Sequence, residues 1–416
     1  MTGPLDGIRI FDLTRVLAGP SCVQILGDLG ADVIKVERPG AGDDTRKFGP
    51  PFVKDWDGNE TSESAYYLAA NRNKRSLTLD LRNAEGQALA RRMIAKCDVL
   101  VENFKVGNLA KYGLSYNDLK DDFPGLVYCS ITGFGQTGPL ADQPGYDFMA
   151  QGMGGLMSIT GPKDGEPHRV GVPIADLTAG LWAAIAINAA LRHQAITGQG
   201  QHLDISLLDT QVATLSIQGL NYLSSGETPE LLGNAHPNIV PYQVFPTTDG
   251  NIIVAVGNDA QFERFAAFIG APELAENKEF ATNEYRVRNR DKLTLILNDI
   301  MAQKSSQNWL EGLESIKVSC GPINRIDQVF ENKQVLARDM KIQMDHPLSS
   351  EPVDLIDAAS PGEVHDGDPV SAILGSGEGQ GGISTRQGEP ALPGVIREVI
   401  SSAYLLDCFS RFWIEN

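Results

Sequence analysis

The first half of the sequence alternates short apolar runs with helical stretches, and this order constrains the fold more than any other feature. Apolar runs predict strands at residues 8–13, 32–37, 76–81, 98–102, 126–132 and 202–206. Helical stretches separate them, including 20–30, which Pro20 opens and Gly30 closes, and 83–96, with Asn83 as its N-cap. Strands separated by helices favour right-handed βαβ units and a mainly parallel sheet. We therefore predict an α/β fold whose large domain is Rossmann-like and doubly wound.

The rest of the chain divides by composition. Helices at 175–195 and 207–223 complete a large domain over residues 1–223, and a stretch rich in Gly, Pro, Asn and Ser at 224–241 is a predicted linker. A strand at 250–256 and helices at 259–269, 283–303 and 306–313 predict a smaller α/β domain over residues 242–330. Residues 357–416 contain nine glycines and no lysine, which is the composition of an atypical, poorly packed tail.

Charge is distributed unevenly along the sequence. The chain carries 35 Lys+Arg and 53 Asp+Glu, a net charge of −18, which argues against a general nucleic-acid binder and against docking on anionic membranes. Residues 1–112 hold 16 basic and 15 acidic side chains, a balance of +1, against 19 and 38 in the remainder, a balance of −19. The early positive charge indicates either solvated helix faces or a locally bound anionic ligand, and composition alone favours the solvated faces.

Several common types of site are not expected. No G-x-G-x-x-G follows the first strand, which argues against a standard dinucleotide site, and the Walker, H-E-x-x-H and G-x-S-x-G motifs are missing. The five cysteines form no C-x-x-C pair and the six histidines show no metal-ligand spacing, so we expect reduced thiols in a cytoplasmic protein and no metal site. We expect no secretory signal, and the apolar stretch 174–195 is expected to be a buried helix rather than a membrane span.

Two segments in the middle of the chain carry candidate chemistry. Glycines within 133–138 and 152–155 permit either plain tight turns or the close approach of backbone N–H groups to a ligand. Asp176 lies in the segment VGVPIADLTAG, near the start of the apolar helix. It is either the N-cap of that helix or a carboxylate nucleophile in an apolar niche, and the residues alone favour the cap.

Basic residues near strand ends are candidates for an anion site. In a doubly wound sheet, ligands bind beyond the carboxyl ends of the strands. Arg38 follows the strand 32–37 and is placed for that role, whereas Lys74 and Arg75 precede their strand.

Eight segments together resemble the family III CoA-transferases, also called the CaiB/BaiF family. They are PLDGIRIFDLTRVLAGP, LGDLGADVIKVERPGAGDDTR, NRNKRSLTLDL, DVLVENF, ITGFGQTGP, GYDFMAQGMGG, VPIADLTAG and GQGQHLDISLLD, in the family's order over about residues 3–350. The segment GNAHPNIVPYQVF is most similar to the branch of succinyl-CoA:hydroxymethylglutarate or glutarate CoA-transferases. The resemblance implies that residues 1–223 bind CoA, that residues 331–356 return toward this large domain after the small one, and that two chains form an interlocked homodimer.

The resemblance also implies a mechanism, in which Asp176 is the nucleophile of a CoA transfer from an acyl-CoA such as succinyl-CoA to a carboxylic acid. In this branch of the family the acid is expected to be a dicarboxylic one. The aspartate carboxylate attacks the thioester, expels the CoA thiolate and forms an anhydride, and CoA passes to the acceptor acid through an aspartyl-CoA thioester. Acyl-CoA and the acid are substrates, and no permanently bound cofactor is implied.

Residue-by-residue matching to the family implies a set of CoA contacts, several of them cations suited to phosphate groups. The set consists of Val16, Leu17 and Ala18 through their backbone, and of Arg38, Asn71, Arg72, Asn73, Lys74, Asn103, Phe104, Lys105, Lys111, Tyr146 and Asp147. Tyr146 and Asp147 match positions at the thioester end. Arg46 and Arg169 are candidates for binding the distal carboxylate of a dicarboxylic acyl group.

The sequence departs from the family beyond about residue 356, where the family's Pro-Pro-Leu-Leu-Gly-like ending is missing. Back-translating GEVHDGDP (362–369) in a shifted frame can give VKFTTETP, which resembles the family's continuation. We hypothesise a frameshift within residues 357–416, which resequencing of the coding DNA would test. Such a change would bear on dimerisation and activity.

Two other functions stay open at this point. An α-methylacyl-CoA racemase needs acid and base groups on opposite faces of the α-carbon, and the family's racemases resemble one another in having GHD where this chain has Gly145, Tyr146 and Asp147. Because tyrosine is a poor substitute for the histidine base, a transferase is favoured. The altered tail leaves open a catalytically impaired CoA-binding protein.

Overall fold

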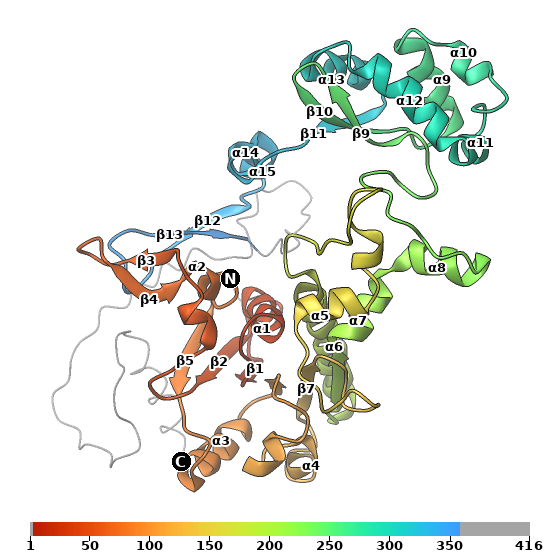
Figure 1. Ribbon diagram of the computed structural model, residues 1–416. Coiled ribbons are helices and arrows are strands. Elements are labelled where there is room, and N and C mark those ends of the chain that lie inside the picture. Colours follow the sequence, from red (N-terminus) through yellow and green to blue (C-terminus); the bar gives the residue numbers. More distant parts are fainter. Residues whose placement is uncertain (1–2, 358–416) are drawn as a thin grey trace. The chain divides into compact units, whose positions relative to one another are not determined.

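The computed structural model describes residues 3–357, which fall into two compact units (Figure 1). Contacts group residues 3–154, 171–214 and 334–357 into the first unit, and residues 155–170 and 215–333 into the second. The second unit thus takes in residues 155–170 and 215–223, which the sequence prediction assigns to the large domain. The hypothesised frameshifted tail, residues 357–416, lies outside the described residues apart from Asp357.

A six-stranded sheet forms the centre of the first unit. Its strands follow the order β5-β2-β1-β6-β7-β8, and every neighbouring pair is parallel. The bounds are β1 (Arg9–Asp12), β2 (Asp32–Glu37), β5 (Lys74–Thr78), β6 (Val99–Glu102), β7 (Val127–Thr132) and β8 (His202–Ser206). The prediction of an α/β fold with a parallel sheet is confirmed, with the third strand two residues earlier than expected.

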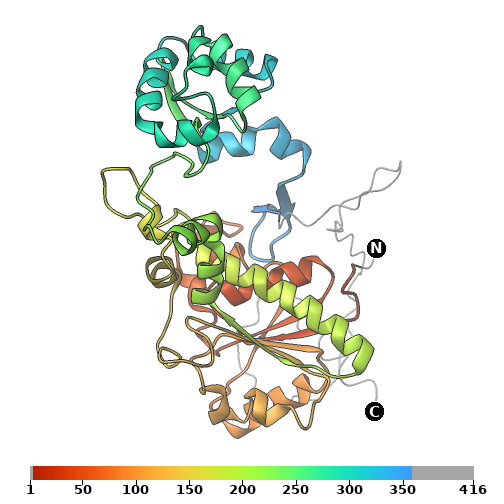
Figure 2. The same cartoon turned by 90° about the vertical axis from the view of Figure 1, so that its right-hand side faces the viewer.

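Helices cover both faces of this sheet because the side chains of each strand alternate between two apolar cores. One core joins the sheet to α1 (Ala18–Asp28) and α6 (Ile174–Thr197), and the other joins it to α3 (Ala84–Ile94) and α4 (Tyr116–Leu119), as Figure 2 shows. The first core takes Ile10, Val33, Val99 and Val127, and the second takes their neighbours Phe11, Ile34, Leu100 and Tyr128. Asn83 caps α3, as predicted, by accepting a hydrogen bond from the backbone N–H of Gly86.

Shorter elements surround the sheet. They are η1 (Asp44–Lys47), β3 (Phe52–Lys54), β4 (Glu60–Ser64), α2 (Ala65–Leu68), η2 (Leu109–Tyr112), α5 (Asp147–Met153), α7 (Leu207–Thr214), β12 (Lys341–Met344) and β13 (Val353–Ile356). Polar contacts connect the hairpin β12–β13 to the rest of the first unit. Arg72 donates a hydrogen bond to the carbonyl oxygen of Ile356 at 2.8 Å, and His346 lies 2.9 Å from a carboxylate oxygen of Glu63.

The second unit contains a three-stranded antiparallel sheet of order β11-β10-β9 packed against helices. Its elements are η3 (Met157–Ile159), α8 (Ser216–Ser225), β9 (Tyr242–Thr247), β10 (Gly250–Ala255), α9 (Asp259–Phe268), α10 (Glu273–Glu276), α11 (Asn283–Arg288), α12 (Arg290–Met301), α13 (Ser306–Ser315), β11 (Ser319–Pro322) and α14 (Ile326–Glu331), and α15 (Lys333–Ala337) follows. Two predicted helices are each divided in the structure: the helix at 207–223 breaks before Ser216, which has a φ of 48°, and the helix at 283–303 breaks at Asn289.

Helix α6 is long and apolar enough to meet the criterion for crossing a membrane, by length and composition alone. The core helix of a folded domain meets the same criterion. In this chain α6 buries eight residues, among them Ala179, Ala183 and Ile187, in the core that it shares with α1 and the sheet. Its burial therefore favours the expectation of a core helix.

Candidate active site

Helix α6 is capped by the carboxylate of Asp147, which lies in the first turn of α5. Oδ1 of Asp147 accepts hydrogen bonds from the backbone N–H groups of Ala175 at 2.8 Å and Asp176 at 3.4 Å. These contacts satisfy donors that a helix start leaves without partners. The interpretation of Asp176 as the N-cap is therefore wrong, because Pro173 occupies that position and Asp176 lies inside the first turn.

Because Asp147 caps α6, the carboxylate of Asp176 is available to react with a substrate. No residue within the described part of the chain donates a hydrogen bond to it, and burial raises its pKa to about 7, with the negative charge of Asp147 adding to the rise. A carboxylate in this environment is a better nucleophile than a fully solvated one, since it is only partly solvated and no hydrogen-bond donor of the described residues stabilises its charge.

Gly180 sets how closely α6 approaches α1. A Cβ on Gly180 would lie 2.8 Å from the carbonyl oxygen of Ala18, so this spacing requires glycine. Asp176 lies four residues earlier and therefore on the same face of α6. The sequence-predicted backbone contacts Val16, Leu17 and Ala18 form the turn into α1, which brings them to the side of the unit on which Asp176 lies.

Two tyrosines lie close to this carboxylate pair. Tyr146, a predicted site residue, is the N-cap residue of α5 and is 65% exposed. Tyr66 in α2 was missed by sequence reasoning: burial raises its pKa, and the charges of Asp176 and Asp147 raise it further, which shows that it lies within electrostatic range of both. No local sequence pattern indicates Tyr66, because its position depends on how the β3–β4 hairpin folds back on the unit.

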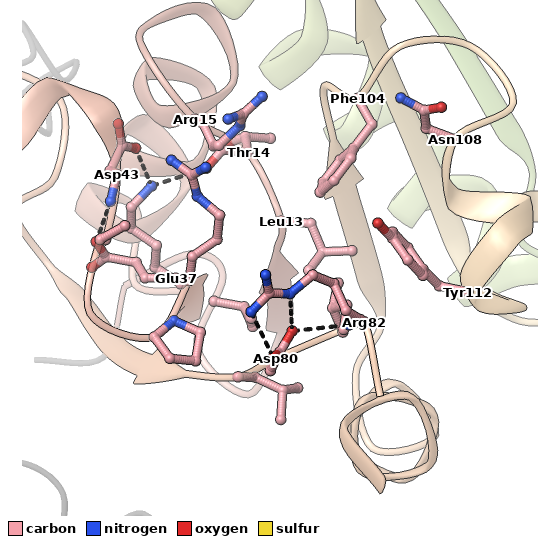
Figure 3. Close-up of a pocket in the computed structure, with 18 of the residues that line it drawn as sticks. Leu13, Thr14, Arg15, Glu37, Asp43, Asp80, Arg82, Phe104, Asn108 and Tyr112 are labelled. Carbon is pink, nitrogen blue, oxygen red and sulfur yellow. Dashed lines mark hydrogen bonds and ion pairs between the residues drawn. The ribbon is translucent and has the colours of Figure 1, made fainter. Parts of the chain in front are cut away.

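A cavity of about 480 Å³ opens at the carboxyl ends of β5, β2, β1 and β6 (Figure 3). From β1 the chain adds strands first on one side, β2 and β5, and then on the other, β6, β7 and β8. Open α/β sheets bind ligands at the point between β1 and β6 where this direction changes. Five basic residues line the cavity, Arg15, Lys35, Arg38, Arg82 and Lys111, together with the aromatic rings of Phe104 and Tyr112. Among the described residues, no group of three or more His, Cys, Asp or Glu side chains is arranged to hold a metal ion.

Three of the predicted CoA contacts, Arg38, Phe104 and Lys111, come together in this cavity. The predicted run 71–74 does not line it, because these residues lie before β5 and at its start, near the opposite end of the strand. Their side chains have other partners: Arg72 and Asn73 donate to the carboxylate of Asp28, and Lys74 donates to Oδ1 of Asn71 and lies 3.7 Å from a carboxylate oxygen of Asp12 at the end of β1.

The remaining two predicted residues near β6 have separate positions. Asn103 binds the backbone of Arg15 through both its amide oxygen and its amide nitrogen, while Lys105 is exposed. Neither lines the cavity, although both adjoin Phe104, which does.

Sequence reasoning missed the part of the cavity that follows β5, which consists of residues 79–82, as well as Arg15 and Tyr112. The signal for residues 79–82 was present, since they follow a predicted strand and ligands bind beyond the carboxyl ends of strands. Arg82 lies there with its guanidinium paired to Asp80 at 2.8 Å, and the pair is exposed.

The expectation that Arg46 binds a substrate carboxylate does not fit the structure. Its guanidinium donates to both carboxylate oxygens of Glu37, at 2.8 and 2.7 Å, and to Glu63 at 2.6 Å, and it lies 3.9 Å from the ring centre of Tyr67. Arg46 therefore holds the loop after β2 in place. Arg169 belongs to the second unit, and its position relative to Asp176 is not described.

The raised pKa of Asp176 predicts that Asp176→Asn stabilises the protein at alkaline pH. The folded chain binds the Asp176 proton more tightly than the unfolded chain, whose ordinary pKa is 3.8, so ionisation opposes folding increasingly between pH 4 and 7 and fully above pH 7. We expect a higher free energy of unfolding for the variant at pH 8, by at most about 4 kcal/mol, and a smaller difference at pH 5. Urea unfolding measures it, with Asp142→Asn as an exposed control. Equal or lower stability of Asp176→Asn at pH 8 would contradict the assignment of a partly buried carboxylate that has no donor among the described residues.

Comparison with known proteins agrees with this arrangement. The model of CoA-transferase family III matches residues 5–369, past residue 356, at which we expected the likeness to end. A succinate–glutarate CoA-transferase of Agrobacterium fabrum is 51% identical over 82% of this chain and 85% of its own length, and a human succinyl-CoA:glutarate CoA-transferase is 46% identical over 83% and 77%. A crystal structure of a CaiB/BaiF family protein from Brucella suis, 49% identical, covers 88% of this chain and 94% of its own with a TM-score of 0.75. The chain belongs to CoA-transferase family III.

Proposed function

We propose that this CoA-transferase moves CoA between succinyl-CoA and glutarate, or a dicarboxylic acid close to glutarate, with Asp176 as its nucleophile. The observation that carries the proposal is the carboxylate of Asp176, which is partly buried, has no hydrogen-bond donor among the described residues and lies on the face of α6 that meets α1. The names of the relatives from Agrobacterium fabrum and human support the choice of substrates.

In the first half of the reaction, a carboxylate oxygen of Asp176 attacks the thioester carbonyl of succinyl-CoA. The C–S bond breaks, CoA leaves as its thiolate, and a succinyl–aspartyl anhydride forms. The thiolate then attacks the aspartyl carbonyl of that anhydride, which releases succinate and leaves CoA on Asp176 as a thioester. Water must be excluded during these steps, because it would hydrolyse either intermediate.

The second half reverses these steps with the acceptor. A carboxylate oxygen of glutarate attacks the aspartyl thioester and expels the CoA thiolate, which forms a glutaryl–aspartyl anhydride. The thiolate attacks the glutaryl carbonyl, so that glutaryl-CoA leaves and the Asp176 carboxylate is restored. Tyr66 is a candidate donor to the developing oxyanions, since its raised pKa keeps its hydroxyl protonated.

We assign the cavity at the carboxyl edge of the sheet to the nucleotide part of CoA, the position at which a Rossmann-like domain binds its ligand. CoA carries a 3′-phosphate and a pyrophosphate, and Arg15, Arg38, Arg82 and Lys111 supply the cations. Arg15 and Arg38 are paired with Asp44 at 3.0 and 2.6 Å. Such half-exposed pairs contribute little stability, so their exchange for phosphate contacts is not costly.

The activity itself tests the proposal. Purified protein with succinyl-CoA is offered glutarate, hydroxymethylglutarate, itaconate, mesaconate or formate, and the CoA thioesters are followed by mass spectrometry. We expect the most rapid exchange with a dicarboxylate, a loss of at least about a thousandfold in Asp176→Ala, and full activity in Asp142→Asn. Exchange that persists in Asp176→Ala would refute the assigned nucleophile, and epimerisation of a 2-methylacyl-CoA without exchange would favour the racemase.

We further propose that the protein is a homodimer, the state that the family resemblance implies. The first unit exposes large apolar side chains on α5, α6 and α7, which pack against one another. These are Phe148, Met149, Met153, Leu181, Trp182, Ile185 and Val212, each at least 41% exposed. Exposed large apolar side chains on helices that contact one another are typical of a protein–protein interface.

Sedimentation equilibrium measures the oligomeric state directly. The chain has a mass of 44.9 kDa, and we expect a species of twice that mass at micromolar concentration, because the exposed apolar side chains favour association. A single species of chain mass at these concentrations would contradict the dimer.

A further inference from the structure

The turn between β1 and α1 holds a β-branched residue in a backbone conformation that favours glycine. Val16 has a φ of 69°, in the left-handed region that L side chains rarely adopt. Such a conformation persists only where the surrounding structure holds it, and it is often found where a chain is pre-organised for a ligand. Val16 also begins the stretch 16–18 whose backbone is expected to contact CoA.

A buried ion pair holds both ends of this turn. Nζ of Lys35 donates to the carbonyl oxygen of Thr14 at 3.0 Å and to Oδ2 of Asp43 at 2.9 Å. The other carboxylate oxygen of Asp43 accepts the backbone N–H of Val16 at 3.3 Å. The pair therefore binds the residue two positions before Val16 and the N–H group of Val16 itself.

Two further side chains complete the support of the turn. Oδ1 of Asp12 accepts the backbone N–H of Thr14 at 2.8 Å. The amide of Asn103 accepts the N–H of Arg15 at 2.9 Å and donates to its carbonyl oxygen at 2.7 Å. The backbone from Thr14 to the N–H of Val16 is thus held by side chains from β1, from β2 and the loop after it, and from the end of β6.

Burial of the Lys35–Asp43 pair points to a role beyond stability. The side chains of Lys35 and Asp43 are 1% and 0% exposed. Removing two charges from water costs about as much as their attraction returns, so a buried pair is weak evidence of stabilisation and is better explained by the geometry that it imposes. Here the pair imposes the conformation of residues 14–16, which we call the Val16 turn. Thr14 and Arg15 of this turn line the cavity, as do Lys35 and Asp43.

We propose that Lys35 and Asp43 are positioning residues, which hold the Val16 turn in the conformation that binds acyl-CoA before the substrate arrives. The inference rests on the proposed function. Without the pair, Val16 relaxes toward negative φ and displaces the backbone of Leu17 and Ala18. The fraction of molecules competent to bind CoA then falls, and the apparent Kd rises by the same factor.

Calorimetric binding of CoA to the full chain tests this. In Lys35→Met and in Asp43→Asn we expect the Kd for CoA to rise about tenfold, equivalent to about 1.4 kcal/mol. The KM for succinyl-CoA rises in parallel, whereas kcat changes by less than about threefold. Asp32→Asn is the control on the same strand. Asp32 lies at the start of β2, at the opposite end from the cavity, so removing its ion pairs with Arg75 at 2.6 Å and Arg9 at 3.7 Å should leave the Kd unchanged.

The two variants separate positioning from direct attraction to the phosphates. Attraction alone would weaken CoA binding in Lys35→Met but strengthen it in Asp43→Asn, which removes a negative charge, whereas loss of positioning weakens it in both. Glycine adopts positive φ without strain, so adding Val16→Gly to Lys35→Met should return the Kd to within about threefold of the wild-type value. If Lys35→Met does not fold, the milder Asp43→Asn carries the test.

Binding in Asp43→Asn that equals or exceeds that of the wild type, or no rescue by Val16→Gly, would overturn the inference. The affinity of the wild-type chain for CoA distinguishes failure of this inference from failure of the proposed function. A wild-type chain that binds no CoA refutes the proposed function, whereas a wild-type chain that binds CoA as its variants do refutes only the positioning role.

Discussion

The capping of α6 by Asp147 is the interaction on which the candidate site depends. A helix that begins in an apolar environment needs an acceptor for its first N–H groups, and Asp147 supplies it at 2.8 Å from the nitrogen of Ala175. Because Asp147 caps the helix, the carboxylate of Asp176 does not. Burial and the negative charge of Asp147 raise the pKa of this carboxylate. The same interaction binds the GYD segment to the start of α6, so that two segments far apart in the sequence form one site.

The sheet adds the second half of the site. Parallel strands end at a common edge, and the residues that follow β1, β2, β5 and β6 form a cavity lined by cations and aromatic rings. The near-neutral charge of residues 1–112, against −19 in the remainder, includes the basic residues of this cavity. Some of the basic side chains are structural, since Arg46 and Arg72 are paired with carboxylates, while Arg38 and Lys111 line the cavity.

Much of the fold could be predicted from the sequence, because buried parallel strands are continuous apolar runs and because Asn83 and the glycines mark helix ends. The strands β9 and β11 and the hairpin β12–β13 were not predicted, since short strands with mixed side chains have no clear period. From the residues alone Asp176 was interpreted as a helix cap, which is wrong, and its role as the nucleophile is implied by the family resemblance and stays a prediction. The resemblance implies that residues 71–74 contact CoA, which stays a prediction. They do not line the cavity, whereas residues 79–82 do, because the cavity lies at the end of β5 and residues 71–74 lie before the strand and at its start. The sequence interpretation gave the capping role to Asp176, whereas Asp147 has it in the structure. The sequence could not show this, because the hydrogen bond from the N–H of Asp176 to Asp147 joins residues 29 positions apart.

The central claim is that CoA passes through a covalent intermediate on Asp176, and oxygen-18 transfer tests it most directly. Protein preloaded with succinyl-CoA is mixed with glutarate that carries oxygen-18 in both carboxylates, the reaction is stopped after a single turnover, and the peptide that contains Asp176 is analysed by mass spectrometry. Because glutarate attacks the aspartyl thioester and leaves as glutaryl-CoA, one labelled oxygen must remain on Asp176. Formation of glutaryl-CoA without label on Asp176 would contradict the account, since CoA would then pass between the two acids without an aspartyl anhydride.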